Sequence, residues 1–201
     1  MSQSDRTVPS FESARKCYRQ VAGALEQAVR TPGDPLRFFA LATAGIDGFP
    51  ECRILVLRDV NAEDRVVEFH CDRRSPKVEQ LRREPRVTLL FHDPLAHWQL
   101  RVPADASVHH RDEVCDRAWR FTSTTSRGNY ACPFASGDPV PEGYVWVPPA
   151  DLPLDSPAFE NFVVVRCRFE TLDLYTISPA AHLRGILSWG ENGAVLTRVA
   201  T

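Results

Sequence analysis

Cationic side chains gather at two places in the sequence where they could hold an anion. Arg53 and Arg58 bracket the apolar run 54–57, and their separation of five residues places them on opposite faces of a regular strand. Downstream, residues 73–77 bring Arg73, Arg74, Ser75 and Lys77 to the predicted start of a helix. Helix N-termini offer free N–H groups and a positive partial charge, so this segment is typical of a phosphate site. A solvated basic loop is the alternative that the spacing alone leaves open.

Other catalytic patterns are missing from the sequence. It contains no Gly-rich dinucleotide or phosphate loop and no Gly-x-Ser-x-Gly nucleophile elbow. None of the cysteines forms a Cys-x-x-Cys pair, and the adjacent His109 and His110 point to opposite faces of a strand. We therefore predict no metal site. In a reducing compartment the six cysteines are expected to be free thiols.

Short apolar runs separated by turns must position these cations. A first helix is expected at about 10–30, with Ser10 as its cap and Pro32-Gly33 after its end, and further helices at 76–83 and 111–121. The predicted strands lie at 37–43, 52–58, 65–70, 87–91, 97–102 (extending as far as 109), 161–169, 185–189 and 194–199.

These elements predict a mainly β (α+β) fold, a closed or partly closed antiparallel barrel with flanking helices. A β-sandwich is the alternative, and it fits less well because helices interrupt the strands. We expect one domain over residues 1–201, with the barrel at about 36–201. Residues 123–160 are rich in Ser, Gly and Pro, and a loop of this length is usually functional or mobile.

Composition limits the classes of partner. The chain has 24 Lys and Arg against 26 Asp and Glu, and this net charge of -2 gives no general affinity for nucleic acid or an anionic membrane. No apolar run approaches the roughly 20 residues of a membrane-spanning helix. The N-terminus also lacks the apolar stretch of a secretory signal, so we expect a cytoplasmic protein with no membrane partner.

Several short segments occur in an order that matches a known family. They run from Arg-Ile-Leu-Val-Leu-Arg at 53–58, through Ser-Pro-Lys at 75–77 and the strand 87–91, to Trp-Gln-Leu-Arg-Val at 98–102. Near the C-terminus, His-Leu-Arg at 182–184 and the ending 198–201 follow. Together these segments resemble the core of the pyridoxamine 5'-phosphate oxidases. The resemblance covers about residues 35–110 well and 162–201 loosely.

The resemblance implies an antiparallel split β-barrel of about six strands that binds FMN as a homodimer, with the cofactor at the interface. By this resemblance Arg53 and Lys77 hold the FMN phosphate, the backbone of 54–57 lies along the flavin, and Gln99 reaches it from the second subunit. Pro76 stands where the family usually has a basic residue, and Arg74 could replace it. The implied cofactor-binding residues are Arg53, Ile54, Leu55, Val56, Arg58, His70, Cys71, Arg74, Ser75, Lys77, Gln99 and Arg184.

Departures from the vitamin oxidases set the functional hypothesis. Arg58 stands where those enzymes have a substrate-binding Lys, Ala180 where they have an Arg, and residues 123–137 resemble their substrate-phosphate segment only loosely. We therefore expect an FMN-dependent oxidoreductase that acts on an unidentified small substrate, with Arg58, Tyr130 and His182 as candidate substrate contacts. No catalytic residue is identified. A non-catalytic FMN or phospho-ligand binding protein, and a true pyridoxamine or pyridoxine 5'-phosphate oxidase, are the alternatives.

Overall fold

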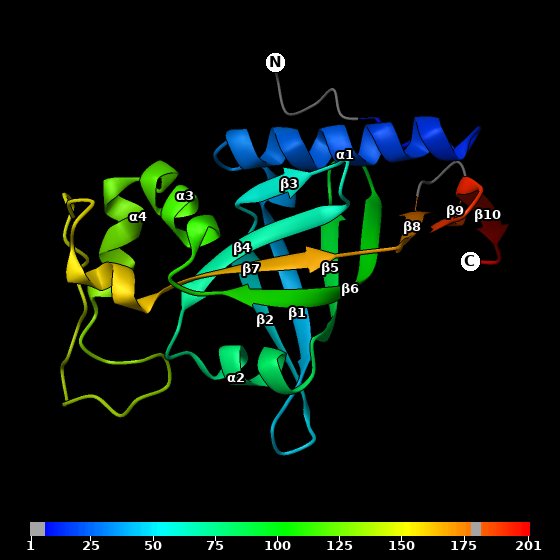
Figure 1. Cartoon of the computed structure of the whole chain (residues 1–201). Helices are drawn as coiled ribbons and strands as arrows, with labels where there is room; N and C mark the ends of the chain where they lie inside the picture. The colour runs from blue at the N-terminus through cyan, green and yellow to red at the C-terminus, as the bar shows by residue number, and fades with distance from the viewer. Residues whose placement is uncertain (1–6, 178–181) are drawn as a thin grey trace.

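A curled antiparallel sheet with helices around it makes up the computed structural model, which describes residues 7–177 and 182–201 (Figure 1). The strands are β1 (Phe38–Ala44), β2 (Pro50–Val56), β3 (Asp59–Asn61), β4 (Val66–Asp72), β5 (Arg86–Asp93), β6 (Trp98–His109), β7 (Phe162–Arg168), β8 (Thr171–Ile177), β9 (His182–Gly190) and β10 (Gly193–Val199). The α-helices are α1 (Ala14–Arg30), α2 (Pro76–Arg83), α3 (Glu113–Phe121) and α4 (Thr124–Gly128). Short 3-10 turns are η2 (Pro35–Arg37), η3 (Asn129–Ala131) and η4 (Pro157–Asn161).

The long strand β6 divides the sheet into two arms. The hydrogen-bonded order is β10-β9-β8-β6-β5-β1-β2, while β7 pairs with both β6 and β4, and β3 pairs with β4. The first residues of β6 pair with β8 and its last residues pair with β7. After β2, the N–H of Arg58 donates to the carbonyl of Glu68 on β4 at 2.9 Å, which joins the end of β2 to the branch formed by β7 and β4. This arrangement confirms the predicted antiparallel split barrel with flanking helices.

Alternating apolar residues fill the inside of the barrel. Strand β1 turns Phe39 and Leu41 inward, β4 turns Phe69 inward and β5 turns Leu89 and Phe91 inward, and all of these are buried. The Phe39 ring lies 5.9 Å from the Phe69 ring and 5.0 Å from the Phe91 ring. This aromatic cluster supports β1 and β4, the strands next to the predicted cofactor segments.

Strand β7 is buried on both faces because it lies between two apolar clusters. Val163 and Val165 belong to the main core, whereas Phe162 and Val164 pack with Trp119 of α3 in a second cluster. This second cluster holds α3 and α4 against the outside of the barrel, on the left of Figure 1. The chain segment after Gly128 also packs closely, since a Cβ at Gly128 would lie 2.4 Å from the carbonyl oxygen of Pro149.

The structure corrects the predicted cap of the first helix. Ser13, not Ser10, is the N-cap, and its hydroxyl accepts from the backbone N–H three residues later at 3.3 Å. The Ser10 hydroxyl instead accepts from the Glu12 N–H at 3.3 Å, and the Ser10 N–H donates to the Gln20 side chain at 2.7 Å. Ser10 therefore forms a turn before the helix, an alternative use of serine close to a helix start.

Two strands and a helix were not expected from the sequence. Strand β3 is short and occupies a segment that was predicted to be a turn, and α4 lies within the predicted loop 123–160. Strand β8 has clear alternation, with Leu172 and Leu174 facing inward and Asp173 and Tyr175 facing outward. Residues 132–156 form no helix or strand, as expected for that part of the loop.

We expect Phe69→Ala to destabilise the fold strongly, because it leaves a cavity in the aromatic cluster beneath β4. The expected loss in the free energy of unfolding is about 3–5 kcal/mol, measured by urea denaturation. Phe49 lies at a hairpin tip and is 71% exposed, so Phe49→Ala is the matched control, with a change of about 0.5 kcal/mol or less. Equal losses for the two variants would contradict the assignment of the core.

Candidate functional site

Arg53 and Lys77, which are far apart in the sequence, come together beside β1. Arg53 extends from the edge strand β2, and Lys77 lies in the first turn of α2. Burial lowers the pKa of Lys77, and the positive charge of Arg53 close by lowers it further, against the opposing effect of Cys71. The structure therefore brings the two predicted phosphate ligands close enough for their charges to act on each other.

Arg53 is held by a network of acceptors from β1, β2 and α2. Its Nη1 donates to the Thr43 hydroxyl at 2.6 Å, and its Nη2 donates to Gln80 Oε1 at 3.0 Å and to Glu51 Oε2 at 2.8 Å. The Thr43 hydroxyl in turn donates to Gln80 Oε1 at 2.8 Å. Because Thr43 and Gln80 are buried, the guanidinium position is determined by the core rather than by solvent.

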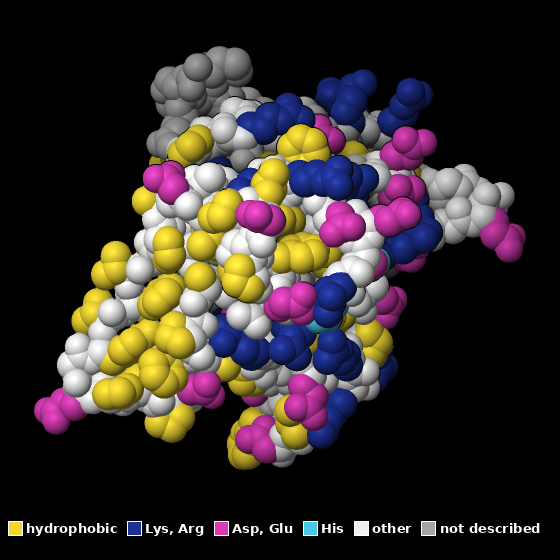
Figure 2. All heavy atoms as spheres, turned by 60° about the vertical axis from the view of Figure 1, so that its left-hand side comes forward, with side chains coloured by type: hydrophobic (Ala, Val, Ile, Leu, Met, Phe, Trp, Pro, Cys, Tyr) yellow, Lys and Arg dark blue, Asp and Glu magenta, His cyan; other side chains and the backbone are white. Residues whose placement is uncertain are grey.

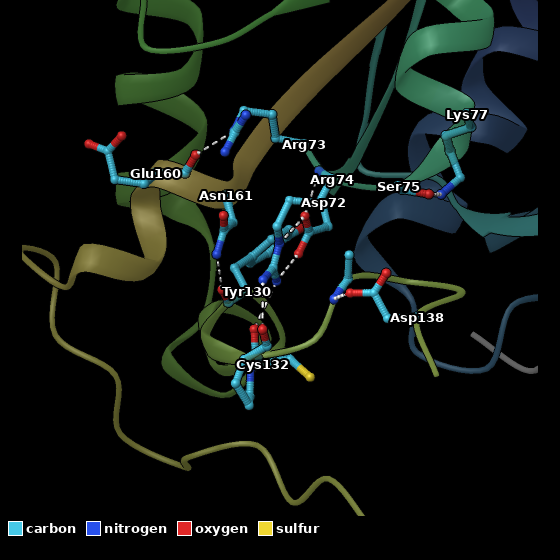
Figure 3. A network of polar contacts seen from close by, with 12 residues as sticks. Asp72, Arg73, Arg74, Ser75, Lys77, Tyr130, Cys132, Asp138, Glu160 and Asn161 are labelled. Carbon is cyan, nitrogen blue, oxygen red and sulfur yellow. Dashed lines mark hydrogen bonds and ion pairs between the residues drawn. The ribbon is translucent and has the colours of Figure 1, made fainter. Parts of the chain in front are cut away.

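Lys77 has a different environment, in which no carboxylate of the described residues forms an ion pair with it. Its Nζ donates to the hydroxyl of Ser75 at 2.5 Å, and Ser75 is the buried N-cap of α2 (Figure 3). Pro76 occupies the first helical position, where its missing N–H removes no helix hydrogen bond. Ser75 and Lys77 thus present a hydroxyl and an ammonium group at a helix N-terminus.

Arg74 turns away from this pair. Its Nε and Nη2 donate to the Asp72 carboxylate at 3.0 and 2.7 Å, and its Nη2 also donates to the Cys132 carbonyl at 2.8 Å. Figure 3 shows Arg74 directed toward Cys132, while Lys77 and Ser75 lie on the α2 side. The structure therefore does not bring Arg74 together with Lys77. Arg74 joins the start of the 132–156 segment to the loop before α2.

Gln99 and Arg184 lie in one row on the outer face of the sheet. In the strand register Gln99 is opposite Tyr175, and Tyr175 is opposite Arg184. Residues directly opposite in a sheet share a face, so Tyr175 lies between the two predicted flavin contacts. Sequence reasoning missed Tyr175 because it missed β8. The alternation of residues 171–177 was the signal that could have found it.

An acidic residue orients Arg184 on this face. The Nε and Nη2 of Arg184 donate to the two carboxylate oxygens of Asp173 at 3.0 and 2.8 Å, and Arg101 also donates to that carboxylate. The hydrogen bond from Arg184 is the largest cause of the lowered pKa of Asp173. His182 begins β9 and is exposed, with its ring 6.4 Å from the Tyr175 ring. Ala180 lies outside the described residues.

His70 and Cys71 occupy alternate faces of β4. Cys71 is buried toward the main core, and burial raises its pKa to about 12. The His70 Nε2 lies 3.2 Å from Glu68 Oε1, and Arg166 donates to Glu68 Oε2 at 3.0 Å. Burial lowers the pKa of His70, against an opposing effect of Glu68, so the ring is neutral at pH 7. Burial alone would raise the pKa of Glu68, but the hydrogen bonds from His70 and Arg166 lower it.

A cavity of about 540 Å³ lies between these β4 side chains and helix α3. Arg58 reaches into it from the chain after β2, and no carboxylate or carbonyl oxygen of the described residues accepts from its guanidinium. Burial lowers the pKa of Arg58, and the charge of Arg37 adds to this effect. The lining residues are Val29, Arg37, Leu57, Arg58, Asp59, Glu68, His70, Arg117, Ala118, Phe121, Thr122, Ser123 and Ser126.

The mouth of this cavity combines an exposed aromatic ring with cations and hydroxyls. Phe121 is 87% exposed although it is a large hydrophobic residue, and Ser123 and Ser126 follow it at the start of α4. Figure 2 turns the α3 and α4 side of the molecule forward and shows Lys and Arg side chains gathered beside a broad group of hydrophobic ones. Such a surface suits a ligand with both an apolar part and an anionic group.

Tyr130 lies behind the cavity in the second apolar cluster. Its ring packs 5.0 Å from the Phe162 ring and 5.9 Å from the Trp119 ring. Burial raises its pKa, although the positive charge of Arg58 opposes the shift. The phenol therefore stays protonated near neutral pH, and the structure places it as a packed residue close to Arg58.

The predicted flavin-edge strand has one open side. Ile54 is 66% exposed on the outer face of β2, whereas Leu55 packs partly against the core and Val56 is half-buried.

No helix of residues 7–177 and 182–201 is long and apolar enough to cross a membrane. The same part of the chain contains no group of three or more His, Cys, Asp or Glu residues that could hold a metal ion.

Comparison with known proteins finds a family match in the first half of the chain. Residues 18–110 match the family model of the pyridoxamine 5'-phosphate oxidase FMN-binding domain. A pyridoxine/pyridoxamine 5'-phosphate oxidase from Azorhizobium caulinodans is 32% identical over 101 residues, which are 50% of this chain and 46% of that protein. The corresponding enzyme from Rhodopseudomonas palustris strain HaA2 is 33% identical over 101 residues, again 50% of this chain and 46% of the enzyme. The chain thus spans about half the length of these relatives.

Solved structures share the fold over the whole chain. A pyridoxamine 5'-phosphate oxidase-related, FMN-binding protein from Nostoc punctiforme superposes with a TM-score of 0.76 at 19% identity, covering 96% of this chain and 100% of that one. PhzG from Burkholderia lata, solved with tetrahydrophenazine-1-carboxylic acid, has a TM-score of 0.73 at 18% identity and covers 100% of both chains. Residues 18–110 are therefore similar to the FMN-binding domain of the pyridoxamine 5'-phosphate oxidases, and the chain shares the fold of these solved structures.

Proposed function

We propose that this protein is an FMN-dependent oxidoreductase that acts on a small anionic substrate in the cavity at Arg58. The observation that carries the proposal is a pair of cations, Lys77 and Arg58, that are half-buried without a carboxylate partner among the described residues. A partly desolvated cation is costly unless an anion approaches it. Two such cations near β2 suit two anionic groups, one on the cofactor and one on the substrate.

The residues at the start of α2 fit the phosphate of FMN. Lys77 and Arg53 provide charge-assisted donors, Ser75 provides a hydroxyl, and the free N–H groups of the first helical turn add to the positive potential. Bound FMN supplies two-electron redox chemistry at its ring system, while the protein supplies binding, orientation and electrostatics. In this proposal the backbone of residues 54–57 lies along the ring edge, and Arg58 lies where the flavin edge meets the cavity.

The cavity then receives the substrate. Arg58 is the best placed anion ligand, because its guanidinium has unused donors and a fixed position after β2. Ser123 and Ser126 provide hydroxyls on the opposite wall, and Phe121 covers an apolar part of the substrate. His70 is neutral and held by Glu68, so it acts as a hydrogen-bonding wall residue rather than as a second cation. Tyr130 and His182 stay candidate substrate contacts.

We infer a homodimer from the outer face of the sheet. Phe38, Ile54 and Leu90 are 47%, 66% and 39% exposed, and the strand register places Ala40 between Ile54 and Leu90. The same face carries Gln99, Tyr175 and Arg184 at its other end. A two-fold contact of this face with itself places the polar end of one chain against the apolar strands of the other. Gln99, Tyr175 and Arg184 would then complete the flavin site of the second subunit.

Two related activities compete with this proposal. A true pyridoxamine or pyridoxine 5'-phosphate oxidase is favoured by the sequence relatives, which carry that activity in their names. A non-catalytic FMN-binding protein needs the phosphate site but not the cavity. The cytoplasmic location and the single domain over 1–201 also stay proposals.

The test of the proposed function is to load the purified protein with FMN and record its visible spectrum, its reduction by NAD(P)H, and its turnover of pyridoxamine 5'-phosphate with oxygen.

The outcomes of this test separate the hypotheses. Flavin reduction and reoxidation without pyridoxal 5'-phosphate formation support the proposed oxidoreductase of a different substrate. Steady formation of pyridoxal 5'-phosphate and hydrogen peroxide supports the vitamin oxidase. A tightly bound flavin that no donor reduces and no substrate perturbs supports the binding protein. Absence of any bound flavin rejects the proposal.

The phosphate site predicts that Arg53→Ala and Lys77→Ala each weaken FMN binding about ten- to a hundredfold. Each removes a charge-assisted hydrogen bond worth about 1.5–3 kcal/mol, and a tenfold change corresponds to about 1.4 kcal/mol. Riboflavin lacks the phosphate, so its affinity should stay within about twofold in both variants. Fluorescence titration with the two flavins measures both effects. Arg83→Ala is the control, since Arg83 lies on the same helix and pairs with Glu79 in solvent. A loss of riboflavin binding equal to the loss of FMN binding would contradict the assignment.

The dimer predicts that Leu90→Glu disrupts association and FMN binding together. A carboxylate at this outer-face position would be desolvated in the interface, so the variant should be a monomer of about 22.6 kDa, whereas the wild type should have about twice this mass. Light scattering coupled to gel filtration measures the mass. Leu154→Glu is the matched control, because Leu154 is 51% exposed and its carbonyl accepts from Trp119 beside α3. A wild-type monomer at micromolar concentration overturns the prediction.

The cavity predicts that Arg58→Gln weakens binding of an anionic ring compound about ten- to a hundredfold, for the loss of one charged partner. Pyridoxal 5'-phosphate is a suitable probe, and the measurement is the spectral change that it causes in the FMN-loaded protein. Arg120→Gln is the control, because Arg120 is exposed on α3 and does not line the cavity. If both variants bind the probe as the wild type does, the cavity is not the anion site.

A further inference from the structure

Glu51 borders the predicted phosphate site, where it pairs with Arg53 and its negative charge also acts on Lys77. Its Oε2 accepts from Nη2 of Arg53 at 2.8 Å, and its Oε1 accepts from Nε2 of Gln80 at 2.6 Å. Gln80 is only 2% exposed and belongs to the buried side of α2. Both carboxylate oxygens are therefore engaged, one of them by an anchored residue. The Glu51–Arg53 contact is better ordered than a pair of free surface side chains.

Arg53 has few donors left for another anion. Its Nη1 donates to Thr43 Oγ1 at 2.6 Å and to the Leu41 carbonyl at 3.5 Å, and its Nη2 donates to Glu51 and Gln80. Each terminal nitrogen of a guanidinium carries two hydrogens, so these four acceptors account for both nitrogens. A phosphate that binds the end of Arg53 must displace one of them.

The four acceptors differ in how easily a phosphate could displace them from Arg53. Thr43 and Gln80 are buried, and the Leu41 carbonyl belongs to the backbone of β1. The Glu51 side chain is 46% exposed, and it alone of the four carries a negative charge that opposes a phosphate. Glu51 is therefore the acceptor that a phosphate would replace. Lys77 forms no ion pair with a carboxylate of the described residues, although the charges of Asp72 and Glu51 raise its pKa, and its described side-chain acceptor is the Ser75 hydroxyl.

We propose that Glu51 is a specificity-determining residue that competes with the ligand phosphate for Arg53. This inference rests on the proposed FMN site. Glu51 lowers the affinity for a flavin that carries a phosphate and leaves the affinity for a phosphate-free flavin unchanged. It therefore reduces the discrimination between FMN and riboflavin that Arg53 and Lys77 would otherwise give. Because the competition is between charges, it weakens as the salt concentration rises.

The test is fluorescence titration of Glu51→Gln with FMN and with riboflavin. The amide keeps the size of the side chain and removes its charge, so FMN should bind about three- to thirtyfold more tightly, as expected for removal of a partly exposed competing charge. Riboflavin affinity should stay within about twofold, which also reports that the variant is folded. Glu79→Gln is the matched control, because Glu79 lies on α2 and pairs with Arg83 instead of Arg53. An equal gain in the control would assign the effect to net charge and overturn the proposal.

The same substitution in an Arg53→Ala background isolates the competition. If Glu51 acts through Arg53, the gain from Glu51→Gln falls below about twofold when Arg53 is absent, as a double-mutant cycle measures. A gain that persists in full would overturn competition for Arg53. An unchanged FMN affinity in Glu51→Gln, with wild-type protein that binds FMN, also overturns the inference. Wild-type protein that does not bind FMN rejects the proposed function itself, so the two failures are distinguishable.

Discussion

The structure depends on keeping positive charge half-buried beside β2 without neutralising all of it. Arg53 is matched by Glu51, whereas Lys77 and Arg58 have no carboxylate partner among the described residues. Desolvation of such groups opposes folding, and the lowered pKa values of Lys77 and Arg58 are the electrostatic sign of that cost. The packing of the surrounding core must offset this cost of desolvation. The aromatic cluster of Phe39, Phe69 and Phe91 provides that core directly beneath the strands concerned.

The division of the sheet at β6 separates the parts of the site in space. The β1, β2 and β5 arm presents the backbone edge and the apolar outer face, and the β8 and β9 arm presents Tyr175 and Arg184. Both groups lie on the outer face of the same sheet. The two-fold contact proposed above would bring the polar group of one chain against the apolar group of its copy. Asp173 would support such a contact, because it orients Arg184 on this open surface through two hydrogen bonds.

Much of this fold could be predicted from the sequence, because periodicity and turns report local structure. The antiparallel barrel and helix α2 followed from alternating apolar residues and from Ser75-Pro76. The cap at Ser13 could not be separated from Ser10 by residue type alone, since both are serines that can form turns or caps. The outward pattern of β8 was overlooked because it follows a strongly apolar strand with only a short turn between them.

The candidate site could be predicted only in part, because many of its side-chain contacts join residues from different elements of the fold. The joint role of Arg53 and Lys77 was implied by a resemblance, and the packing of α2 on β1 brings the two cations within range of each other's charge. The partners of Arg74 could not be predicted, because the Cys132 carbonyl lies in a segment without periodicity. The role of Glu51 was also invisible, since it depends on Gln80 bringing a carboxylate and a guanidinium together across two elements. Side-chain contacts between elements therefore need the three-dimensional structure.

The arginine at position 58 would shape the substrate preference of the proposed site. A lysine at this position would offer a point charge on a flexible stem, whereas arginine presents a planar fork that can bind a carboxylate or phosphate through two hydrogen bonds. The fork is longer and less strongly hydrated, so it can reach farther into the cavity between β4 and α3. The cavity is also lined by the hydroxyls of Ser123 and Ser126 and by Arg37 and Arg117. In the proposed function, Arg58 would therefore favour a substrate that is anchored by one planar anionic group, and the exposed ring of Phe121 would be free to contact its apolar part.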